Sequence, residues 1–448
     1  MPALAHLLRD AVESGDWSAF ADHLDNDAVL DSSSEAGRRQ VTGTKAIERH
    51  LSGPGPGEVP VWDAQEWGTG VAVTFEWHGE SGADRRRWYV RAGENGRVSE
   101  IWSTAARPDE AGESSAPTAP QALLDELGAT RTTPLSHGGN SGAALLRAEG
   151  DGPDFILKRV GGGGSDWLAR ATADEGRTAQ LYEAGVFHRM PDSIGHGIVA
   201  VERDGDAAWV AMRDVGSLLL PGNARLSREE SRRIHAAAAG LHRTFRGAAL
   251  PGAATLAARV GMSSPAIGES ERDQPDLLPK QFEQGWDAFG DLVPGDIANV
   301  VLGLAGDVRP LADALVEAFG GTTLIHGDLR GDNLGFDGER LVLIDWDLAA
   351  AGTPGAEFAW YLAHSHRRID ADHNEIEADH LEAQGDELSE AEHELGMISG
   401  LVQYGWRIAH SARIHTDPAE TEWGKAELEW WVPRVRLALE REGSRIPA

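Results

Sequence analysis

The distribution of apolar and polar positions divides the chain into two patterned regions. In the first region, apolar residues recur with helical spacing in three segments, 3–12, 17–24 and 44–51, and a short strand is predicted at 28–30. Apolar and polar residues then alternate in four strand-like segments, 59–67, 71–78, 86–92 and 97–104. Asn95-Gly96 is typical of a hairpin turn between the last two segments. The pattern predicts a small α+β domain over residues 1–108.

Between the two regions lies a stretch that is poor in apolar residues. Residues 107–120 read RPDEAGESSAPTAP, and their Pro, Ser, Glu and Ala content is typical of a linker. We therefore predict a linker over residues 109–120 and a second domain over residues 121–448.

The second region begins with a strand, a glycine-rich loop, a strand, a turn and another strand. Apolar alternation over residues 155–160 places Lys158 on one sheet face with Ile156 and Val160. A helix is expected over residues 166–183, with Glu175 on its apolar face, where a carboxylate needs a partner. A further strand over 208–213 is followed by Asp214-Val215-Gly216, where the alternation ends.

Helices dominate the pattern after residue 226. Ser227 and Glu230 form a capping box that starts a helical stripe, and this stripe ends before Gly247. Two more helices are expected within residues 285–319, and the C-terminal part is helical and amphipathic.

A short polar loop and a predicted hairpin interrupt this helical pattern. The sequence HGDLRGDNLGFDGERLVLIDWD starts at His326, and its segments 334–336 and 340–344 meet across Asp337-Gly338, which places Phe336 opposite Glu339. Closing this turn brings Asp328, Asn333 and Asp345 together.

These three residues have the types and the spacing that phosphoryl transfer requires. His326, Asp328 and Asn333 follow the pattern H-x-D-x-x-x-x-N. A hard cation with oxygen ligands neutralises phosphate charge, while a carboxylate aligns the attacking hydroxyl. The alternative is that the Asp and Asn residues only cap turns, as such residues often do.

With HGD and IDWD in place of H-R-D and D-F-G, the chain resembles the aminoglycoside phosphotransferase and choline kinase group of small-molecule kinases. This resemblance implies an α+β, bilobal, protein-kinase-like fold with an antiparallel-sheet N-lobe at about 121–215 and a mainly helical C-lobe at about 216–448. It implies that Asp328 is catalytic, that Asn333 and Asp345 hold Mg²⁺, and that ATP or GTP is the phosphoryl donor. His326 is expected to orient the loop backbone rather than to transfer protons.

The resemblance also implies a set of nucleotide-binding residues. Lys158 would pair with Glu175, with Asp174 as the second choice, although Lys158 could also be an ordinary solvated strand lysine. The complete set comprises the glycine-rich loop, this ion pair and the hinge between the lobes: Gly138, Gly139, Asn140, Ser141, Gly142, Lys158, Glu175, Arg213, Asp214 and Val215.

The first domain, with its early helices and later curled sheet, resembles the SnoaL-like cone fold. Such domains act as enzymes, binding modules or dimerisation domains, and here we expect an accessory role, with a homodimer through this domain as one form of it. Asp63, His78 and Trp88 are candidate pocket residues, and ordinary core or surface positions are the alternative for all three.

Composition limits the classes of molecule that the protein is expected to bind. A net charge of −31 at pH 7 argues against nucleic acids and anionic membranes, because phosphate binding needs clustered basic residues. The absence of cysteine excludes disulfides and thiolate metal sites, and neither a signal peptide nor a membrane-spanning run is found, so we expect a cytoplasmic protein. Eleven acids and no Lys or Arg occur at 370–394, which favours a cationic acceptor if it is not simply a solvated face.

The sequence thus predicts Mg²⁺- and nucleotide-dependent phosphorylation of a small-molecule hydroxyl. An antibiotic of aminoglycoside or nucleoside type, modified as a resistance step, is the leading acceptor class. The main alternative is a catalytically silent nucleotide- or ligand-binding sensor in which the N-terminal domain is the working module, and a hydrolase that uses the same site on water is a third.

Overall fold

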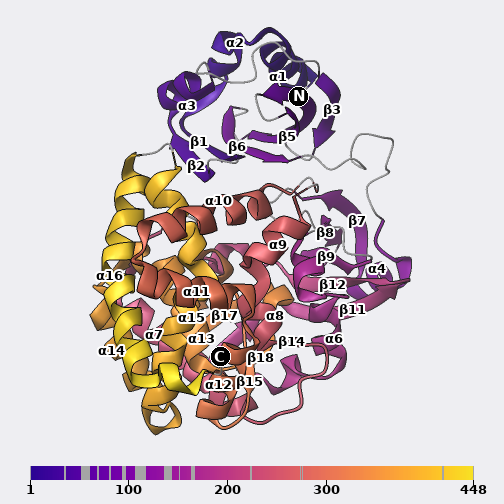
Figure 1. The fold of residues 1–448 in the computed structure, drawn as a ribbon. Coiled ribbons are helices and arrows are strands. Elements are labelled where there is room, and N and C mark those ends of the chain that lie inside the picture. Colours follow the sequence, from indigo (N-terminus) through magenta and orange to yellow (C-terminus); the bar gives the residue numbers. More distant parts are fainter. Residues whose placement is uncertain are drawn as a thin grey trace. The chain divides into compact units, whose positions relative to one another are not determined.

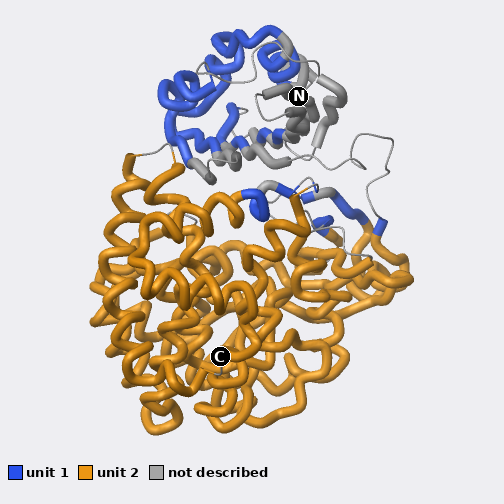
Figure 2. Tube along the Cα trace, in the orientation of Figure 1, with its two compact units in different colours: residues 1–118, 131–147, 273–280 blue, residues 119–130, 148–272, 281–448 orange. Residues whose placement is uncertain are grey.

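The computed structural model describes most of the chain, in two compact units. The described residues are 2–34, 37–51, 61–67, 70–79, 82–92, 97–105, 118–135, 144–150, 152–162, 167–221, 224–272, 274, 276–415 and 418–446. Unit 1 comprises residues 1–118, 131–147 and 273–280, and unit 2 comprises residues 119–130, 148–272 and 281–448 (Figure 2). The predicted boundary at 109–120 falls largely outside the described residues.

Residues 2–105 form a six-stranded sheet with three short helices (Figure 1). The strand order is β2-β1-β6-β5-β4-β3, in which β1 and β6 are parallel and the other neighbours antiparallel. The elements are α1 (Pro2–Ser14), α2 (Ser18–Ala21), β1 (Leu24–Ser34), β2 (Gly37–Thr42), α3 (Thr44–Leu51), β3 (Val61–Trp67), β4 (Gly70–Gly79), β5 (Gly82–Ala92) and β6 (Val98–Ala105). The four predicted strands are confirmed, whereas β2 was missed and β1 is longer than expected.

The core of this α+β part is aromatic and aliphatic. Trp17 stacks on Trp88 with ring centroids 5.2 Å apart, and Leu8 and Phe20 are fully buried beside them. Trp88 is therefore a core residue and not a pocket residue. The side chains of Asp63 and His78 and the turn Asn95-Gly96 lie outside the described residues.

The sheet that follows has the strand order β11-β12-β9-β8-β7. Strand β9 pairs with β12 in antiparallel register, with Lys158 opposite Val210, as the apolar alternation predicted for a sheet strand. The elements up to this point are α4 (Gln121–Leu127), β7 (Ala129–Pro134), β8 (Leu145–Gly150), β9 (Phe155–Gly161), α5 (Trp167–Thr172), α6 (Arg177–Glu183), β10 (Ile194–His196), β11 (Ile198–Asp204) and β12 (Ala207–Arg213).

The helix predicted over residues 166–183 is in fact two helices. The chain breaks between α5 and α6, where Ala173 has φ 50° and Gly176 has φ 92°. The Asp174 carboxylate accepts hydrogen bonds from the main-chain N–H groups of Gly176 and Arg177, at 2.8 and 2.6 Å, and so caps α6. A capping aspartate followed by glycine was the sequence signal for this break.

The chain after β12 is mainly helical, with small sheets between the helices (Figure 1). The capping box of Ser227 and Glu230 at the start of α7 is confirmed. The helices are α7 (Arg228–Phe245), α8 (Leu256–Val260), α9 (Pro265–Ser270), α10 (Leu277–Leu292), α11 (Gly295–Gly306), α12 (Arg309–Phe319), α13 (Pro354–Ser365), α14 (His373–Gln384), α15 (Glu390–Arg413) and α16 (Pro418–Glu442). The strands are β13 (Leu226–Ser227), β14 (Ala254–Thr255), β15 (Thr323–Ile325), β16 (Leu334–Asp337), β17 (Arg340–Leu343), β18 (Ala350–Gly352) and β19 (Ile369–Asp370). Among the described residues, none of the helices combines the length and the apolar character needed to span a membrane.

Helices α15 and α16 approach each other closely at Gly424. A Cβ atom at this position would lie 2.5 Å from the main-chain nitrogen of Ala412 and 2.7 Å from the carbonyl oxygen of Ile408. Both neighbours are helix backbone, which cannot move without displacing the whole helix. The sequence therefore needs glycine here for packing.

We expect Gly424→Ala to destabilise the protein by about 1–3 kcal/mol, the usual range for overpacking a core. Gly303→Ala is the matched control, because Gly303 is an exposed residue of α11 and a Cβ there has no atom within 4 Å. This control should be neutral or stabilising by about 0.5–1 kcal/mol, as alanine is the better helix former. Urea unfolding measures both, and equal effects of the two substitutions would contradict the packing argument.

Candidate active site

The predicted hairpin is present, but its turn lies one residue later than predicted, so the partner of Phe336 is two residues further along the chain. Strands β16 and β17 pair Phe336 with Leu341 and Asp337 with Arg340. The turn residues are therefore Gly338 and Glu339, and Gly338 has φ 58°, the positive value that a type II′ turn needs at its first central position. Strand β10 pairs in parallel with β17, which ties the hairpin to the sequence before β11.

The loop before the hairpin is anchored through its backbone. His326 Nε2 donates to the carbonyl oxygen of Ile344 at 2.9 Å, and its Nδ1 accepts the N–H of Asp328 at 3.3 Å. These two bonds define a neutral imidazole, and burial lowers the pKa of His326. His326 thus orients the loop backbone, as expected.

Gly327 fits a position where no side chain is possible. It has φ 80°, and a Cβ atom would lie 1.9 Å from the carbonyl oxygen of Leu348. Its N–H donates to the buried carboxylate of Glu357 at 3.0 Å, and its carbonyl oxygen accepts a bond from Arg259. Glu357 in turn accepts a 2.8 Å bond from His242. Neither Glu357 nor Arg259 was predicted as a partner of the loop, because only tertiary packing brings them to Gly327.

Asp328 is buried and surrounded by donors. Its Oδ2 accepts from Arg330 Nε at 3.0 Å and from Asn333 Nδ2 at 2.7 Å, while Oδ1 accepts from the indole N–H of Trp360 at 3.1 Å. Burial raises the pKa of Asp328, but the charges of Arg330 and Arg259 outweigh burial, so the pKa is held below its usual range. The carboxylate is therefore ionised at neutral pH.

Asn333 lies against Asp328 on the hairpin side of the loop. Its amide nitrogen donates to both the carboxylate and the main-chain oxygen of Asp328, at 2.7 and 3.0 Å. Because the nitrogen makes both of these bonds, the amide oxygen is the atom that remains for a metal ion. Asp328 and Asn333 are thus brought together as predicted.

Lys158 reaches across from β9 to the end of the hairpin. Its Nζ lies 2.6 Å from Asp345 Oδ1 and 2.5 Å from Asp347 Oδ2. Burial lowers the pKa of Lys158, but the charges of Asp345 and Asp347 outweigh it and raise the pKa above its ordinary value. Burial likewise raises the pKa of Asp345, and the Lys158 charge outweighs it and lowers the pKa. Lys158 is therefore a site residue rather than a solvated strand lysine.

The predicted ion pair between Lys158 and Glu175 is wrong. Glu175 lies at the break between α5 and α6, where its side chain is exposed, because the helix that would have carried it on an apolar face does not continue. Asp174, the second choice, caps α6 instead, and burial together with the nearby charge of Asp347 raises its pKa. Asp347 is the second partner of Lys158, in the place predicted for Glu175.

Asp347 is held by the start of α6. Thr178 donates to its Oδ1 at 2.6 Å, and the buried Arg177 side chain donates to its main-chain oxygen. The second aspartate of the IDWD motif was the available signal for this residue. Arg177 and Thr178 carried no signal of their own.

The family assignment comes from a comparison with family models. Residues 131–393 match the model described as "Phosphotransferase enzyme family". The chain belongs to this family. The match spans both the β7–β12 sheet and the helical part with the hairpin, so the bilobal kinase-like fold expected from the sequence is confirmed, and the protein is a small-molecule phosphotransferase.

Solved structures of the same kind are similar at low identity. An aminoglycoside phosphotransferase from Alicyclobacillus acidocaldarius is 18% identical, with a TM-score of 0.41 and coverage of 74% of this chain and 99% of its own. A spectinomycin phosphotransferase in complex with ADP and its antibiotic is 13% identical, with a TM-score of 0.41 and coverage of 72% and 98%. A choline/ethanolamine kinase family protein from Mesorhizobium loti is 16% identical, with a TM-score of 0.38 and coverage of 72% and 96%. No curated protein matches this phosphotransferase significantly.

The nucleotide-binding residues of the phosphotransferase are described only in part. Gly138, Gly139, Asn140, Ser141 and Gly142 lie outside the described residues. At the hinge, the main-chain N–H of Arg213 donates to the carbonyl oxygen of Gly197 at 2.8 Å. The N–H of Asp214 donates to the carbonyl oxygen of Asp154 at 3.4 Å. Both amides are engaged within the protein, whereas no hydrogen bond from the Val215 N–H is found among the described residues.

The oxygen ligands of the phosphotransferase site suit a hard cation. Asp345 supplies a carboxylate that is 39% exposed on its side chain, and Asn333 supplies its amide oxygen. The left-handed conformation of Asp345, φ 63° and ψ 67°, turns its side chain away from the strand direction toward Lys158. These residues fit Mg²⁺, which prefers few protein oxygens together with phosphate oxygens.

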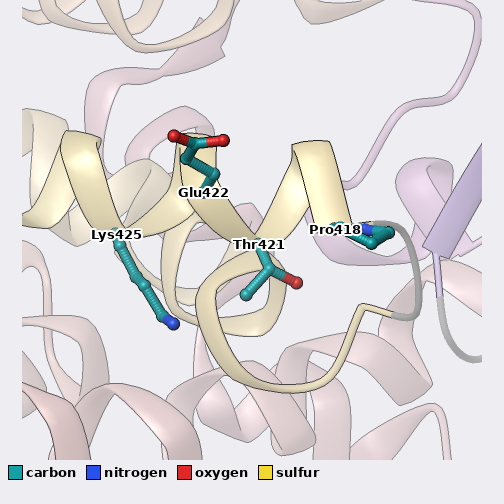
Figure 3. A pocket seen from close by; sticks show the side chains of 4 residues that line it. All are labelled: Pro418, Thr421, Glu422 and Lys425. Atoms are coloured by element: carbon teal, nitrogen blue, oxygen red, sulfur yellow. The ribbon is translucent and has the colours of Figure 1, made fainter.

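A separate depression of about 470 Å³ lies on the first turns of α16 (Figure 3). It is lined by Pro418, Thr421, Glu422 and Lys425, and Figure 3 shows Thr421 and Lys425 extending from the same side of the helix. None of the site residues named above contributes to it.

We expect Lys158→Met to destabilise the phosphotransferase by about 1–3 kcal/mol at pH 7, because two carboxylates lose their shared cation. The loss should be smaller than that of a fully buried pair, since the Asp345 side chain is 39% exposed. The pKa of Asp345 is lowered in the folded protein, so this stabilisation is present above the unfolded value near 4 and is lost as the pH falls through the folded value. The difference between wild type and variant, measured by urea unfolding, should therefore shrink below about pH 4.

Arg159→Met is the control for this substitution. Arg159 is the next residue of β9, and its only ion pair among the described residues is a 3.7 Å contact with the half-exposed Asp204. It should change stability by less than about 0.5 kcal/mol. A pH-independent effect of Lys158→Met, or an equal effect of the two variants, would count against the bridging role.

Proposed function

We propose that the protein transfers the γ-phosphoryl group of ATP or GTP to a hydroxyl of a small molecule in a Mg²⁺-dependent reaction. The observation that carries this proposal is the convergence of Asp328, Asn333, Asp345 and Lys158, which come from β9, the loop and the hairpin. Phosphoryl transfer depends mostly on positioning and charge stabilisation, and these four side chains are the parts that such a site requires.

Asp328 is assigned to the acceptor hydroxyl. Its pKa is below the usual range, so it is a weak proton acceptor in the ground state. In a loose, metaphosphate-like transition state, the hydroxyl becomes acidic only when the new bond forms, and a carboxylate that first aligns it suffices. The three donors on Asp328 hold the carboxylate in one orientation for this purpose.

Asn333 and Asp345 are assigned to Mg²⁺, which when bound would neutralise the charge of the donor phosphates. Lys158 is assigned to the phosphates of the nucleotide, and Asp347 binds its ammonium group in addition to Asp345. The spectinomycin enzyme and a hygromycin B phosphotransferase of similar fold were both solved with ADP, and this supports a nucleotide donor for the present protein.

The acceptor is proposed by class, as a small molecule with a free hydroxyl. Aminoglycoside and nucleoside antibiotics are the first classes to test. The acidic residues at 370–394 support a cationic acceptor less in the structure than in the sequence alone, because several of them are already in ion pairs. Glu375 and Asp379 pair with Arg228, while Glu377 and Glu394 pair with Arg434. Trp406 and Trp431 of the C-terminal helices are buried core residues, so they give no support to an aromatic acceptor pocket.

A silent nucleotide-binding sensor remains the competing function. Such a sensor would have no need for an ionised Asp328 that accepts three hydrogen bonds next to the proposed metal ligands. The accessory role of the N-terminal domain, including a homodimer through it, stays a prediction.

The test is a screen of hydroxylated antibiotics and metabolites for acceptor-dependent consumption of ATP or GTP. With an acceptor in hand, Asp328→Asn should lower turnover by roughly 10²–10⁴ and leave nucleotide binding intact. Asp337→Asn is the matched control, because Asp337 is an exposed aspartate at the turn of the same hairpin. Wild-type turnover in purified Asp328→Asn would remove this residue from catalysis.

Asp345→Ala should weaken the binding of nucleotide in the presence of Mg²⁺ but have little effect in its absence, because the residue acts through the cation. Calorimetric titration of wild type and variant with nucleotide, in the presence and in the absence of Mg²⁺, measures both affinities. If the variant bound nucleotide with wild-type Mg²⁺ dependence, Asp345 would not be a ligand.

A further inference from the structure

A second group of metal-ligating side chains lies outside the phosphoryl-transfer site. His366 follows the end of α13, His373 begins α14, and Glu427 lies in α16. His366 Nδ1 is 3.0 Å from Glu427 Oε1, and His373 Nε2 is 3.1 Å from Glu427 Oε2. All three ligand atoms lie within 4.8 Å of one another. The fold thus gathers two imidazoles and one carboxylate from three separate elements.

The charge of Glu427 is the unusual part of this group. Its side chain is 2% exposed, and its recorded partners are His366, His373 and the indole N–H of Trp431, which donates to Oε2 at 3.1 Å. Among the described residues, none of the hydrogen bonds to this carboxylate comes from Lys or Arg. Among other buried carboxylates of this helical part, Glu394 has Arg434 as a partner, whereas Glu357 is paired with a histidine, as Glu427 is. A buried charge is stable when it is paired or when it coordinates a metal.

We propose that His366, His373 and Glu427 form a binding site for a divalent transition-metal ion, with Zn²⁺ as the ion that fits best. Two imidazole nitrogens and one carboxylate oxygen are a common zinc ligand set, in which a water molecule supplies the fourth ligand. The two nitrogen–oxygen separations, 3.0 and 3.1 Å, run to the two different oxygens of Glu427, so the three side chains are close enough to share one ion after a small shift. Imidazole ligands favour Zn²⁺ over Mg²⁺, so this site differs in chemistry from Asn333 and Asp345.

Trp431 and Trp430 provide the surroundings that such a site needs. Trp431 fixes the carboxylate through its N–H, in the way that a hydrogen bond from behind orients a metal ligand. The His373 ring stacks on two rings: its centroid lies 4.1 Å from that of Trp430 and 3.3 Å from that of His366. The nitrogen lone pairs lie in the ring planes, so one ion can bind both imidazoles only when the rings leave this parallel stack. Binding therefore changes the environment of Trp430.

The proposed metal site is linked to the loop of Asp328 through Arg368, which lies two residues after His366. Arg368 follows His366 in the same 3₁₀ turn and donates to Asp332 Oδ1 at 2.9 Å. Asp332 also accepts a bond from Arg330, which donates to the catalytic Asp328. An ion bound to His366 would fix the turn that carries Arg368. We infer that it acts as a structural ion behind the loop and not as a participant in phosphoryl transfer.

The test uses the untagged full-length protein without nucleotide or Mg²⁺, since a histidine tag would itself bind zinc. Calorimetric titration with Zn²⁺ should show one saturable site per chain. Co²⁺ should give the visible absorption of a nitrogen- and oxygen-ligated ion, and Zn²⁺ should abolish that absorption and change tryptophan fluorescence. His366→Ala and His373→Ala should each weaken Zn²⁺ binding at least about 100-fold, beyond the 10–100-fold typical of a residue behind a ligand.

His188→Ala is the matched control, because His188 is an exposed histidine of the same unit. It should leave binding unchanged. Zinc should also raise the melting temperature of wild type but not of His373→Ala, since only the folded site binds the ion. Should a histidine variant melt before the titration, Glu427→Gln keeps the shape of the side chain and is expected to lose the Co²⁺ absorption. Absence of a saturable site in wild type, or equal binding by wild type and both histidine variants, would overturn the proposal. Neither result bears on phosphoryl transfer.

Discussion

The contact of Lys158 with two carboxylates is the interaction on which the candidate site depends. It joins β9 to the end of the β16–β17 hairpin, residues that are far apart along the chain. Charged groups that are partly withdrawn from solvent need partners, and Asp347 obtains its own from α6. The break between α5 and α6 is therefore part of the site, because it brings Arg177 and Thr178 to Asp347.

A second set of contacts fixes the catalytic loop from the helical side. Glu357 of α13 binds the N–H of Gly327, Arg259 of α8 binds its carbonyl oxygen, and Trp360 of α13 binds Asp328 directly. The loop is thus held by one helix that contacts both its backbone and the carboxylate of Asp328. This explains how a short polar loop keeps a defined shape without long regular structure of its own.

Local pattern predicted the elements of the site better than their partners. The spacing of Asp328, Asn333 and Asp345 and the hairpin between them follow from short-range rules, and the structure brings the three residues together. The hairpin register and the helix over 166–183 were wrong because both depend on single positions: Gly338 takes the first place in the turn, and Ala173 adopts a positive φ. One wrong helix then produced the wrong partner for Lys158. Glu357, Arg259 and Glu427 could not have been found from the sequence, since only tertiary packing brings them to their partners.

The left-handed backbone conformation of Asp345 matters for any attempt to stabilise this protein. A non-glycine residue at φ 63°, ψ 67° carries a conformational cost of roughly 1–2 kcal/mol that glycine would not have. The aspartate at this position is accordingly explained by its contact with Lys158 and by its proposed role as a metal ligand, and not by backbone preference. Glycine at residue 345 would relieve the backbone cost, but it would leave Lys158 with Asp347 alone and would remove the proposed metal ligand. Any stabilisation campaign on this scaffold therefore needs a selection for turnover running alongside it.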